Sequence, residues 1–139
     1  MRVMALDLGS KRIGVAVSDF GGTIASPHSV VARSGSQRRD HEAIRKLIET
    51  EEVEALVVGL PLNLDGSTGP AARAVLTEVE RIGTVAGVPI HLQDERMTTV
   101  AADRILREAD LSASKRRQHV DKIAASVILQ TWLDNRLRS

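Results

Sequence analysis

Runs of apolar residues divide the first third of the chain into three short segments that are typical of β-strands. Positions 2–8 are nearly all apolar, as in a strand that is buried on both faces. Apolar and small residues alternate over 13–18, and the segment 23–32 predicts a third strand, which Pro27 weakens. Because only tight turns separate these segments, we expect them to form an antiparallel meander.

From position 40 onward, apolar residues recur at helical spacing, and two short apolar runs interrupt them. We expect, in order, a helix over 40–53, a central parallel strand over 55–60, a helix over 70–86, a strand over 88–93, and helices over 98–109 and 114–133. Pro70 is placed to open the second helix and Gly87 to end it. The order predicts an α/β fold with a five-stranded mixed sheet, in which two parallel strands join the meander, and helices on both faces.

Length and composition are those of a soluble globular domain. The chain has 139 residues, of which 42% are hydrophobic and 27% charged, so we expect a single domain over 1–139. No apolar run reaches the roughly 18 residues that a membrane span needs. The apolar core of a signal peptide contains no charged residue, but Asp7 interrupts the apolar stretch at the start of this chain, so we expect a cytoplasmic protein.

The missing residue types exclude several kinds of chemistry. Cysteine and tyrosine are absent, which excludes thiolate nucleophiles, cysteine-ligated metal sites and tyrosyl intermediates. Phe20 and Trp132 are the only aromatic residues, too few for a base-stacking platform. The net charge is only +1, so any contact with nucleic acid must come from a local basic patch.

Acidic residues occur where the pattern predicts buried structure. Asp7 ends the first strand and shares its face with Val3 and Ala5, because strand side chains alternate. A buried carboxylate is costly unless it is paired or binds a cation. The alternative is that Asp7 is a turn former ahead of Gly9, and the pattern by itself leaves both interpretations open.

Two more acidic positions lie later in the chain. The triplet 94–96 (Asp-Glu-Arg) follows the last strand, so it places acidic groups at another strand end. The alternative interpretation of this triplet is a solvated loop with a local Glu–Arg pair. Asp121 shares a helical stripe with Ala125 and Ile128, which predicts an inward position. Its alternative is an ion pair with Lys122 or a neighbouring arginine.

Together, these positions suggest carboxylates from two strand ends and one helix that converge on one point. Without a cation they would repel, and at least one pKa would rise. Mg²⁺ or Mn²⁺ relieves that repulsion, because both ions prefer carboxylate oxygens and keep water ligands. Two such ions about 4 Å apart can activate a water molecule and stabilise the leaving oxygen of a phosphodiester.

Four ordered segments resemble the motifs of a known family, the YqgF/RuvX family of pre-16S ribosomal RNA nucleases, which are also described as Holliday-junction-resolvase-like. The segments are Ala5–Asp19 (ALDLGSKRIGVAVSD), Val57–Ser67 (VVGLPLNLDGS), Asp94–Thr99 (DERMTT) and Asp121–Gln130 (DKIAASVILQ). They extend over nearly the whole chain, and the first alone would be shared with other RNase H-like proteins.

The resemblance implies an RNase H-like fold and assigns Asp7, Glu95 and Asp121 as the metal-binding and catalytic set. On this hypothesis Asp7 bridges two Mg²⁺ or Mn²⁺ ions, Glu95 and Asp121 each complete one coordination sphere, and water attacks phosphorus in line. Asp94 is a second-choice ligand. The implied activity is processing of the 5′ end of pre-16S rRNA. The alternative substrate is a Holliday junction, although the family pattern lacks the glutamate that junction resolvases carry at the end of the 55–60 strand.

Basic residues near these acids are candidates for binding nucleic acid, although each position is also typical of a solvated surface. They are Lys11, Arg12, Arg96, Lys115, Arg116, Arg117 and Lys122. The glycine-rich loop over 63–69 could meet a phosphate through its N–H groups, but simple turn chemistry also explains it. The chain could act as a monomer or a homodimer, since a symmetric junction cut needs a dimer and trimming of an RNA end does not.

Two other functions fit parts of the sequence. The turn over 7–10 resembles the first phosphate loop of sugar kinases and actin-like ATPases, but those enzymes need two RNase H-like halves and this chain has room for one. A non-catalytic RNase H-like module that recognises duplexes or branches by shape is the other alternative. Metal-dependent cleavage that the acidic residues support would discriminate the nuclease from this module.

Overall fold

A computed structural model describes the backbone of residues 1–97 and 113–138 and the side chains of 1–97 and 122–136. The elements are β1 (Val3–Leu8), β2 (Arg12–Ser18), β3 (Ala25–Ala32), α1 (Gln37–Thr50), β4 (Ala55–Leu60), α2 (Pro70–Ala86), β5 (Ile90–Asp94), a 3₁₀ turn (Glu95–Met97) and α4 (Ala113–Arg138). The expected helix over 98–109 lies outside the described residues.

The five strands form one mixed sheet in the order β3-β2-β1-β4-β5. β1 pairs antiparallel with β2, and β2 pairs antiparallel with β3, so the predicted meander is confirmed. β4 adds parallel to β1, and β5 adds parallel to β4. The predicted fold class is therefore confirmed, and β1 and β4 lie at the centre of the sheet.

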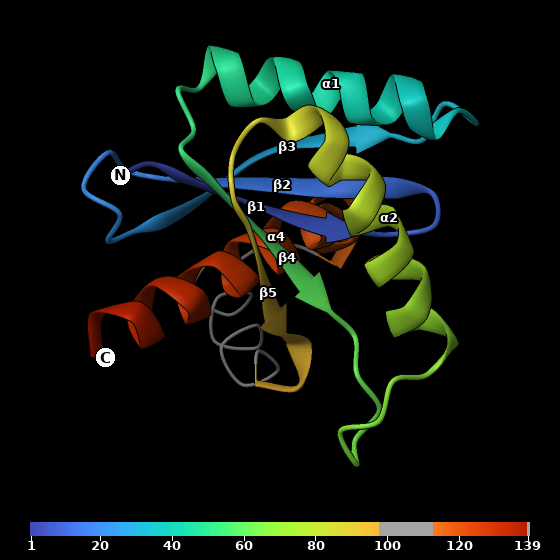
Figure 1. Ribbon diagram of the computed structural model, residues 1–139. Coiled ribbons are helices and arrows are strands. Elements are labelled where there is room, and N and C mark those ends of the chain that lie inside the picture. The colour runs from blue at the N-terminus through green and yellow to red at the C-terminus, as the bar shows by residue number, and fades with distance from the viewer. Residues whose placement is uncertain (98–112, 139) are drawn as a thin grey trace.

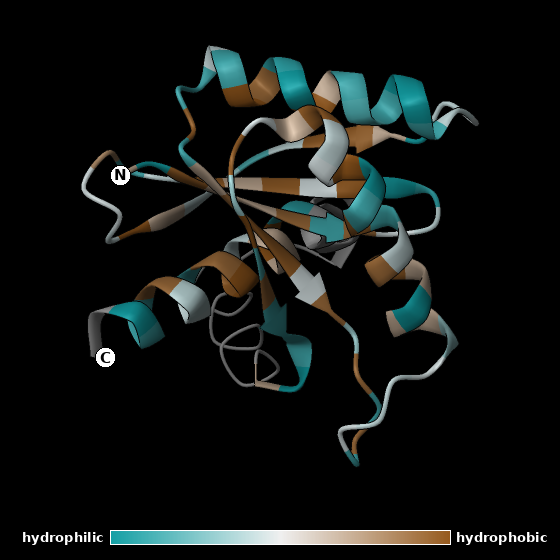
Figure 2. Cartoon of the chain, viewed as in Figure 1, coloured by the Kyte–Doolittle hydropathy of each residue, from teal (hydrophilic) through white to brown (hydrophobic). Residues whose placement is uncertain are grey.

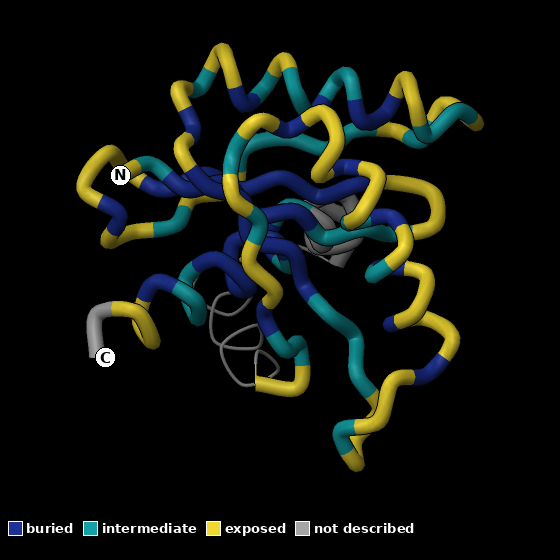
Figure 3. Tube along the Cα trace, in the orientation of Figure 1, coloured by how far each residue is buried: buried dark blue, intermediate teal, exposed yellow. Residues whose placement is uncertain are grey.

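Helices cover both faces of the sheet, with α1 and α2 on one side and α4 on the other (Figure 1). The α1/α2 face packs a core that includes Met4, Leu6, Ile44, Leu56 and Ile82. The inner strands β1, β2 and β4 are strongly apolar (Figure 2) and largely buried (Figure 3), whereas the edge strands β3 and β5 are more polar and more exposed.

The α4 face is built from smaller side chains. Val3, Ala5 and Val57 from the sheet pack there against Ala125 and Ile128 of α4. Small residues let the helix backbone approach the strands closely, as the predicted apolar stripe on this helix requires. Asp7 belongs to the same face of β1 as Val3 and Ala5, because side chains alternate along a strand.

Local hydrogen bonds explain where the element boundaries differ from the pattern. α1 begins at Gln37 rather than at 40, because the Ser36 side chain accepts a hydrogen bond from Arg39 N (3.3 Å) and caps the helix. β3 begins two residues later than predicted, because Asp19 Oδ1 accepts the N–H groups of Thr23 (2.7 Å) and Ile24 (3.0 Å).

α2 spans Pro70–Ala86 as predicted, and Gly87 ends it in the left-handed conformation at φ 72°. That conformation costs glycine little, because it has no Cβ. No helix in the described residues combines the length and the apolar character that a membrane crossing requires.

Candidate functional site

The carboxyl ends of β1 and β4 lie side by side at one edge of the sheet. The parallel register pairs Leu6 with Val58, so the next residues along the two strands are Asp7 and Gly59. Asp7 is half-buried, whereas every residue before it in β1 is buried. The strand register therefore places a carboxylate where the central strands meet solvent, on the face that α4 covers.

Glu95 reaches this point from the end of β5. Its side chain lies over Gly59: a Cβ on that glycine would lie 2.9 Å from Glu95 Oε1 and 2.6 Å from Cδ1 of Ile128 in α4. Gly59 thus provides the space that Glu95 occupies between β4 and α4. Sequence analysis did not single out Gly59, although a glycine inside an apolar strand often marks a close approach by another group.

Burial and two neighbouring carboxylates raise the pKa of Glu95 to about 7. Burial is the largest cause, followed by the charge of Asp7 and then that of Asp94. Asp7 and Glu95 are therefore close enough to interact through space, as the convergence of the acidic residues predicted. Repulsion of this kind is what a bound cation would relieve.

Asp121 lies within α4, one helical turn before Ala125, and the predicted helix is confirmed at this position. Its side chain lies outside the described residues. Among the side chains that the structure describes, no three His, Asp or Glu form a group that could hold a metal ion. The structure thus brings two members of the predicted set together, and the third stays a prediction.

The carboxylate of Asp94 binds Arg96. Arg96 Nη2 lies 2.6 Å from Asp94 Oδ2, Nε lies 3.0 Å from both carboxylate oxygens, and the Arg96 backbone N–H also donates to Oδ1 (2.9 Å). Hydrogen bonds from Arg96 hold the pKa of Asp94 below its usual value. The local pair in this triplet is therefore Asp94–Arg96 rather than Glu95–Arg96.

The structure describes the side chains of four residues that are predicted to contact nucleic acid. Lys11 and Arg12 are exposed at the tip of the hairpin between β1 and β2, next to Asp7 in the chain. Lys122 is half-buried in α4, and Arg96 is exposed beside Asp94. The side chains of Lys115, Arg116 and Arg117 lie outside the described residues.

The loop between β4 and α2 closes on itself. Gly66 N donates to Asn63 O (2.8 Å), and Ser67 N donates to Asp65 Oδ1 (2.8 Å), so these N–H groups are used within the loop. The Asn63 side chain also donates to Ser67 Oγ (2.9 Å). Turn chemistry explains this segment, and these two amides are not the phosphate ligands that its composition suggested.

A buried ion-pair network behind the site was missed by the sequence analysis. Arg33 binds both oxygens of Glu78 (2.6 and 2.9 Å), and His41 Nε2 lies 2.7 Å from Glu78 Oε2. Arg33 Nε also donates to the carbonyl of Gly9 (3.0 Å), two residues after Asp7. Glu78 lies between Val75 and Ile82 on the apolar stripe of α2, and that position was the signal that could have revealed it.

Comparison with known proteins identifies the family. A family model described as "RuvX: Holliday junction resolvase" matches residues 1–135. The chain belongs to the RuvX family. Two curated relatives, from Thermoanaerobacter pseudethanolicus and Moorella thermoacetica, are 47% and 48% identical to it. The alignments cover 97% of both chains for the first, and 96% of this chain and 95% of the relative for the second; both relatives bear the name "putative pre-16S rRNA nuclease".

Solved structures show which fold this RuvX-family chain has. It resembles Thermus thermophilus RuvC in complex with a Holliday junction substrate, with a TM-score of 0.64, 18% identity, and coverage of 100% of this chain and 97% of that one. A second RuvC structure from the same organism gives a TM-score of 0.56 at 16% identity, over 99% and 97% of the two chains. The predicted RNase H-like fold is therefore confirmed.

Proposed function

We propose that this chain is a divalent-metal-dependent nuclease that hydrolyses phosphodiester bonds of structured nucleic acid. The observation that carries the proposal is the meeting of Asp7 and Glu95 over Gly59, at the carboxyl ends of adjacent strands. Both are acidic positions that the resemblance assigned to metal binding. Membership of the RuvX family supports the same reaction class.

The donor set suits Mg²⁺ or Mn²⁺, and we propose two ions. Carboxylate oxygens are the ligands that hard divalent cations prefer, and the mutual repulsion of Asp7 and Glu95 is the condition that such a cation relieves. Asp7, Glu95 and Asp121 would hold the ions. When bound, such ions supply an activated water molecule and stabilise the leaving oxygen of the phosphodiester.

The other residues orient the substrate and the site. Lys11 and Arg12, at the hairpin tip directly after Asp7, would bind phosphates on either side of the scissile bond. Arg33 holds the Gly9 carbonyl and so fixes the backbone that leads away from Asp7. Lys115, Arg116, Arg117 and Lys122 would add backbone contacts from α4, and Arg96 from the end of β5.

Pre-16S rRNA is the substrate that we propose, because the curated relatives at 47% and 48% identity are named as nucleases of that RNA. The 5′ end is the cleavage position that the family resemblance implies. A Holliday junction is the second candidate. The family description and the RuvC–junction complex favour it. Trimming one RNA end needs a single active site, whereas resolving a junction needs two symmetric cuts.

Asp7→Asn, Glu95→Gln and Asp121→Asn should each lower cleavage at least about a thousandfold, since each removes a charged metal ligand but keeps the side chain's shape. The assay compares a pre-16S rRNA fragment with a four-way DNA junction, in Mg²⁺, in Mn²⁺ and in EDTA. We expect cleavage of the RNA, dependence on the metal, and loss of cleavage in all three variants.

Asp134→Asn is the matched control, because Asp134 is an exposed carboxylate on α4 that accepts a hydrogen bond only from Gln130 (3.0 Å) among the contacts described. It should cleave like the unmodified chain. Full activity of Asp7→Asn, or cleavage that persists in EDTA, would contradict the metal-dependent mechanism. Binding of either substrate without cleavage in any metal would instead favour the non-catalytic module.

A further inference from the structure

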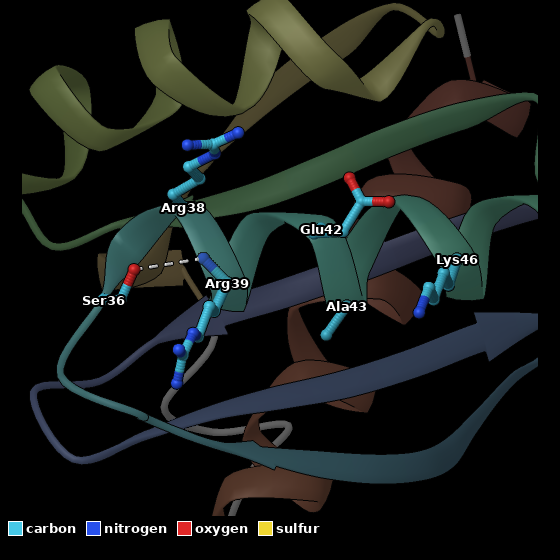
Figure 4. Close-up of a pocket in the computed structure, with 6 residues that line it drawn as sticks. All are labelled: Ser36, Arg38, Arg39, Glu42, Ala43 and Lys46. Atoms are coloured by element: carbon cyan, nitrogen blue, oxygen red, sulfur yellow. Dashed lines mark hydrogen bonds between the residues drawn. The ribbon is translucent and has the colours of Figure 1, made fainter.

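The outward face of α1 carries basic side chains around a shallow hollow. The hollow measures about 570 Å³ and is lined by Ser36, Arg38, Arg39, Glu42, Ala43 and Lys46. Figure 4 shows Arg39, Ala43 and Lys46 projecting from one side of the helix and Arg38 and Glu42 from the other. We call Arg39 and Lys46, with Ala43 between them, the α1 basic surface.

The acidic residues of α1 neutralise this surface only in part, because Glu42 attracts Lys46 and Arg38 through space but binds neither of them. Arg45 binds Glu42 (Nη2–Oε1 2.6 Å) and also forms an ion pair with Glu49. The remaining carboxylate of the helix, Asp40, is buried and accepts the Ser34 N–H (3.0 Å). Within the described part of the chain, neither Arg39 nor Lys46 has a side-chain hydrogen bond or an ion pair. The positive charge there is available to a ligand.

The start of α1 lies near the hairpin that follows Asp7, although α1 covers the opposite face of the sheet from the candidate active site. The backbone N–H of Arg33, just before α1, donates to the carbonyl of Lys11 at the hairpin tip (2.9 Å). The helix therefore starts beside the cations that follow Asp7. Arg39 and Lys46 are seven residues apart, which separates them by about 10 Å along the helix axis.

The chemistry of this surface fits a phosphate backbone better than a protein or a membrane. Protein interfaces need large apolar or aromatic anchors, whereas the centre of this surface is the methyl group of Ala43. A helix that lies on a membrane must insert its apolar face, but Ile44 and Ile48 of α1 are buried in the core. Cations without apolar anchors are typical of contacts with nucleic-acid backbones.

We propose that the α1 basic surface binds the sugar–phosphate backbone of a double-helical flank of the substrate, outside the bond that is cleaved. This inference rests on the proposed function, because it assumes a nucleic-acid substrate. The flank would extend from the carboxylates, past Lys11 and Arg12, to the side of α1. Contacts of this kind give affinity and orientation without sequence preference.

The test is the salt dependence of binding to a labelled 20-base-pair RNA duplex with a single-stranded 5′ extension, in EDTA to prevent cleavage. Each phosphate contact contributes roughly 0.9 to the slope of log K against log salt concentration. Arg39→Ala and Lys46→Ala should each reduce that slope by roughly 0.9, and the double variant by roughly 1.8. All three should unfold at the same temperature as the unmodified chain, since both residues are exposed.

Arg45→Ala is the matched control: it lies on the same helix and removes the same charge, but its guanidinium is already bound to carboxylates. It should leave the slope unchanged. Unaltered slopes in Arg39→Ala and Lys46→Ala, or an equal reduction in Arg45→Ala, would overturn this inference while leaving the proposed function intact. Failure of the unmodified chain to bind this duplex at all would also overturn the inference, whereas the proposed function is overturned only when neither the RNA nor the four-way junction is cleaved in Mg²⁺ or Mn²⁺.

Discussion

At the residue scale, the candidate site depends on one absent side chain. Gly59 leaves open the space in which the Glu95 carboxylate lies, between β4 and Ile128 of α4. The same enclosure removes water from Glu95, and Asp7 adds a nearby negative charge. Local packing and local charge therefore act in the same direction, and both favour the protonated form of Glu95.

We expect Glu95 to titrate near pH 7 in the metal-free chain, as followed by NMR of its side-chain carboxyl carbon. Asp7→Asn should lower this pKa, because it removes a negative charge, but should leave it above the usual 4.5, because burial is the larger cause. Divalent metal must displace the proton, so its affinity should rise with pH up to about 7. A pKa of Glu95 unaffected by Asp7→Asn would contradict the convergence of the two carboxylates.

Because its pKa is raised, Glu95 contributes to the free energy of unfolding in a way that depends on pH. The folded chain holds this proton more tightly than the unfolded chain, so the contribution of Glu95 to the free energy of unfolding is fully present below the usual pKa of 4.5. It is lost as the pH rises through about 7. If the proposed metal site exists, Mg²⁺ should restore stability above that pH, because carboxylates from distant segments meet only in the folded chain.

At the scale of the elements, Glu78 connects three segments behind the site. It lies on α2 and binds Arg33 after β3 and His41 of α1, and Arg33 in turn holds Gly9. Burial alone would raise the pKa of Glu78, but the hydrogen bonds from Arg33 and His41 outweigh it and hold the pKa below its usual value. The packing of α1 and α2 is thereby coupled to the backbone beside Asp7.

Glu78→Ala should lower the free energy of unfolding at pH 7 by roughly 3 kcal/mol, because it leaves the half-buried Arg33 and the buried His41 without their shared carboxylate. Urea denaturation measures the change, and Glu80→Ala, on the exposed side of the same helix, should cost less than about 0.5 kcal/mol. The contribution of Glu78 is present above its unfolded pKa and is lost as the pH falls through the lower folded value. The free energies of unfolding of the two variants should therefore become more similar at acidic pH. A difference between them that grows at acidic pH would contradict this account.

At the scale of the whole molecule, the net charge is small, but positive charges are concentrated at particular places on the surface. The chain has a net charge of only +1, yet it places Lys11 and Arg12 beside Asp7 and two further cations on the outward side of α1. The two faces of the sheet therefore differ. The carboxylates lie on the face that α4 covers, and the α1 basic surface lies on the helix that covers the opposite face.

A chain that trims one RNA end should work as a monomer. We expect light scattering coupled to size-exclusion chromatography to give a mass near 15.0 kDa at concentrations that support RNA cleavage. A dimer at those concentrations, with paired symmetric nicks in a four-way junction, would favour the Holliday junction as substrate instead of pre-16S rRNA.

Much of the architecture was accessible from the amino-acid sequence, because it follows from short-range rules. Period-two and helical spacing predicted the strands and helices, and Pro70 and Gly87 set the ends of α2. Boundaries shifted where a single side chain intervened, as when Ser36 capped α1 or Asp19 captured the amides before β3. The pattern of hydrophobicity contains no information on such side-chain contacts.

The sequence by itself determined the order of the strands along the chain, the class of the fold and the acidic positions worth testing. Only the tertiary structure decided that Glu95 turns toward Asp7 while Asp94 turns to Arg96, and that Glu78 is buried between two helices. Alternation and helical periodicity are local properties of the backbone. Which side chains meet across the sheet depends on packing between distant segments, where the absence of one Cβ at Gly59 leaves room for the Glu95 carboxylate.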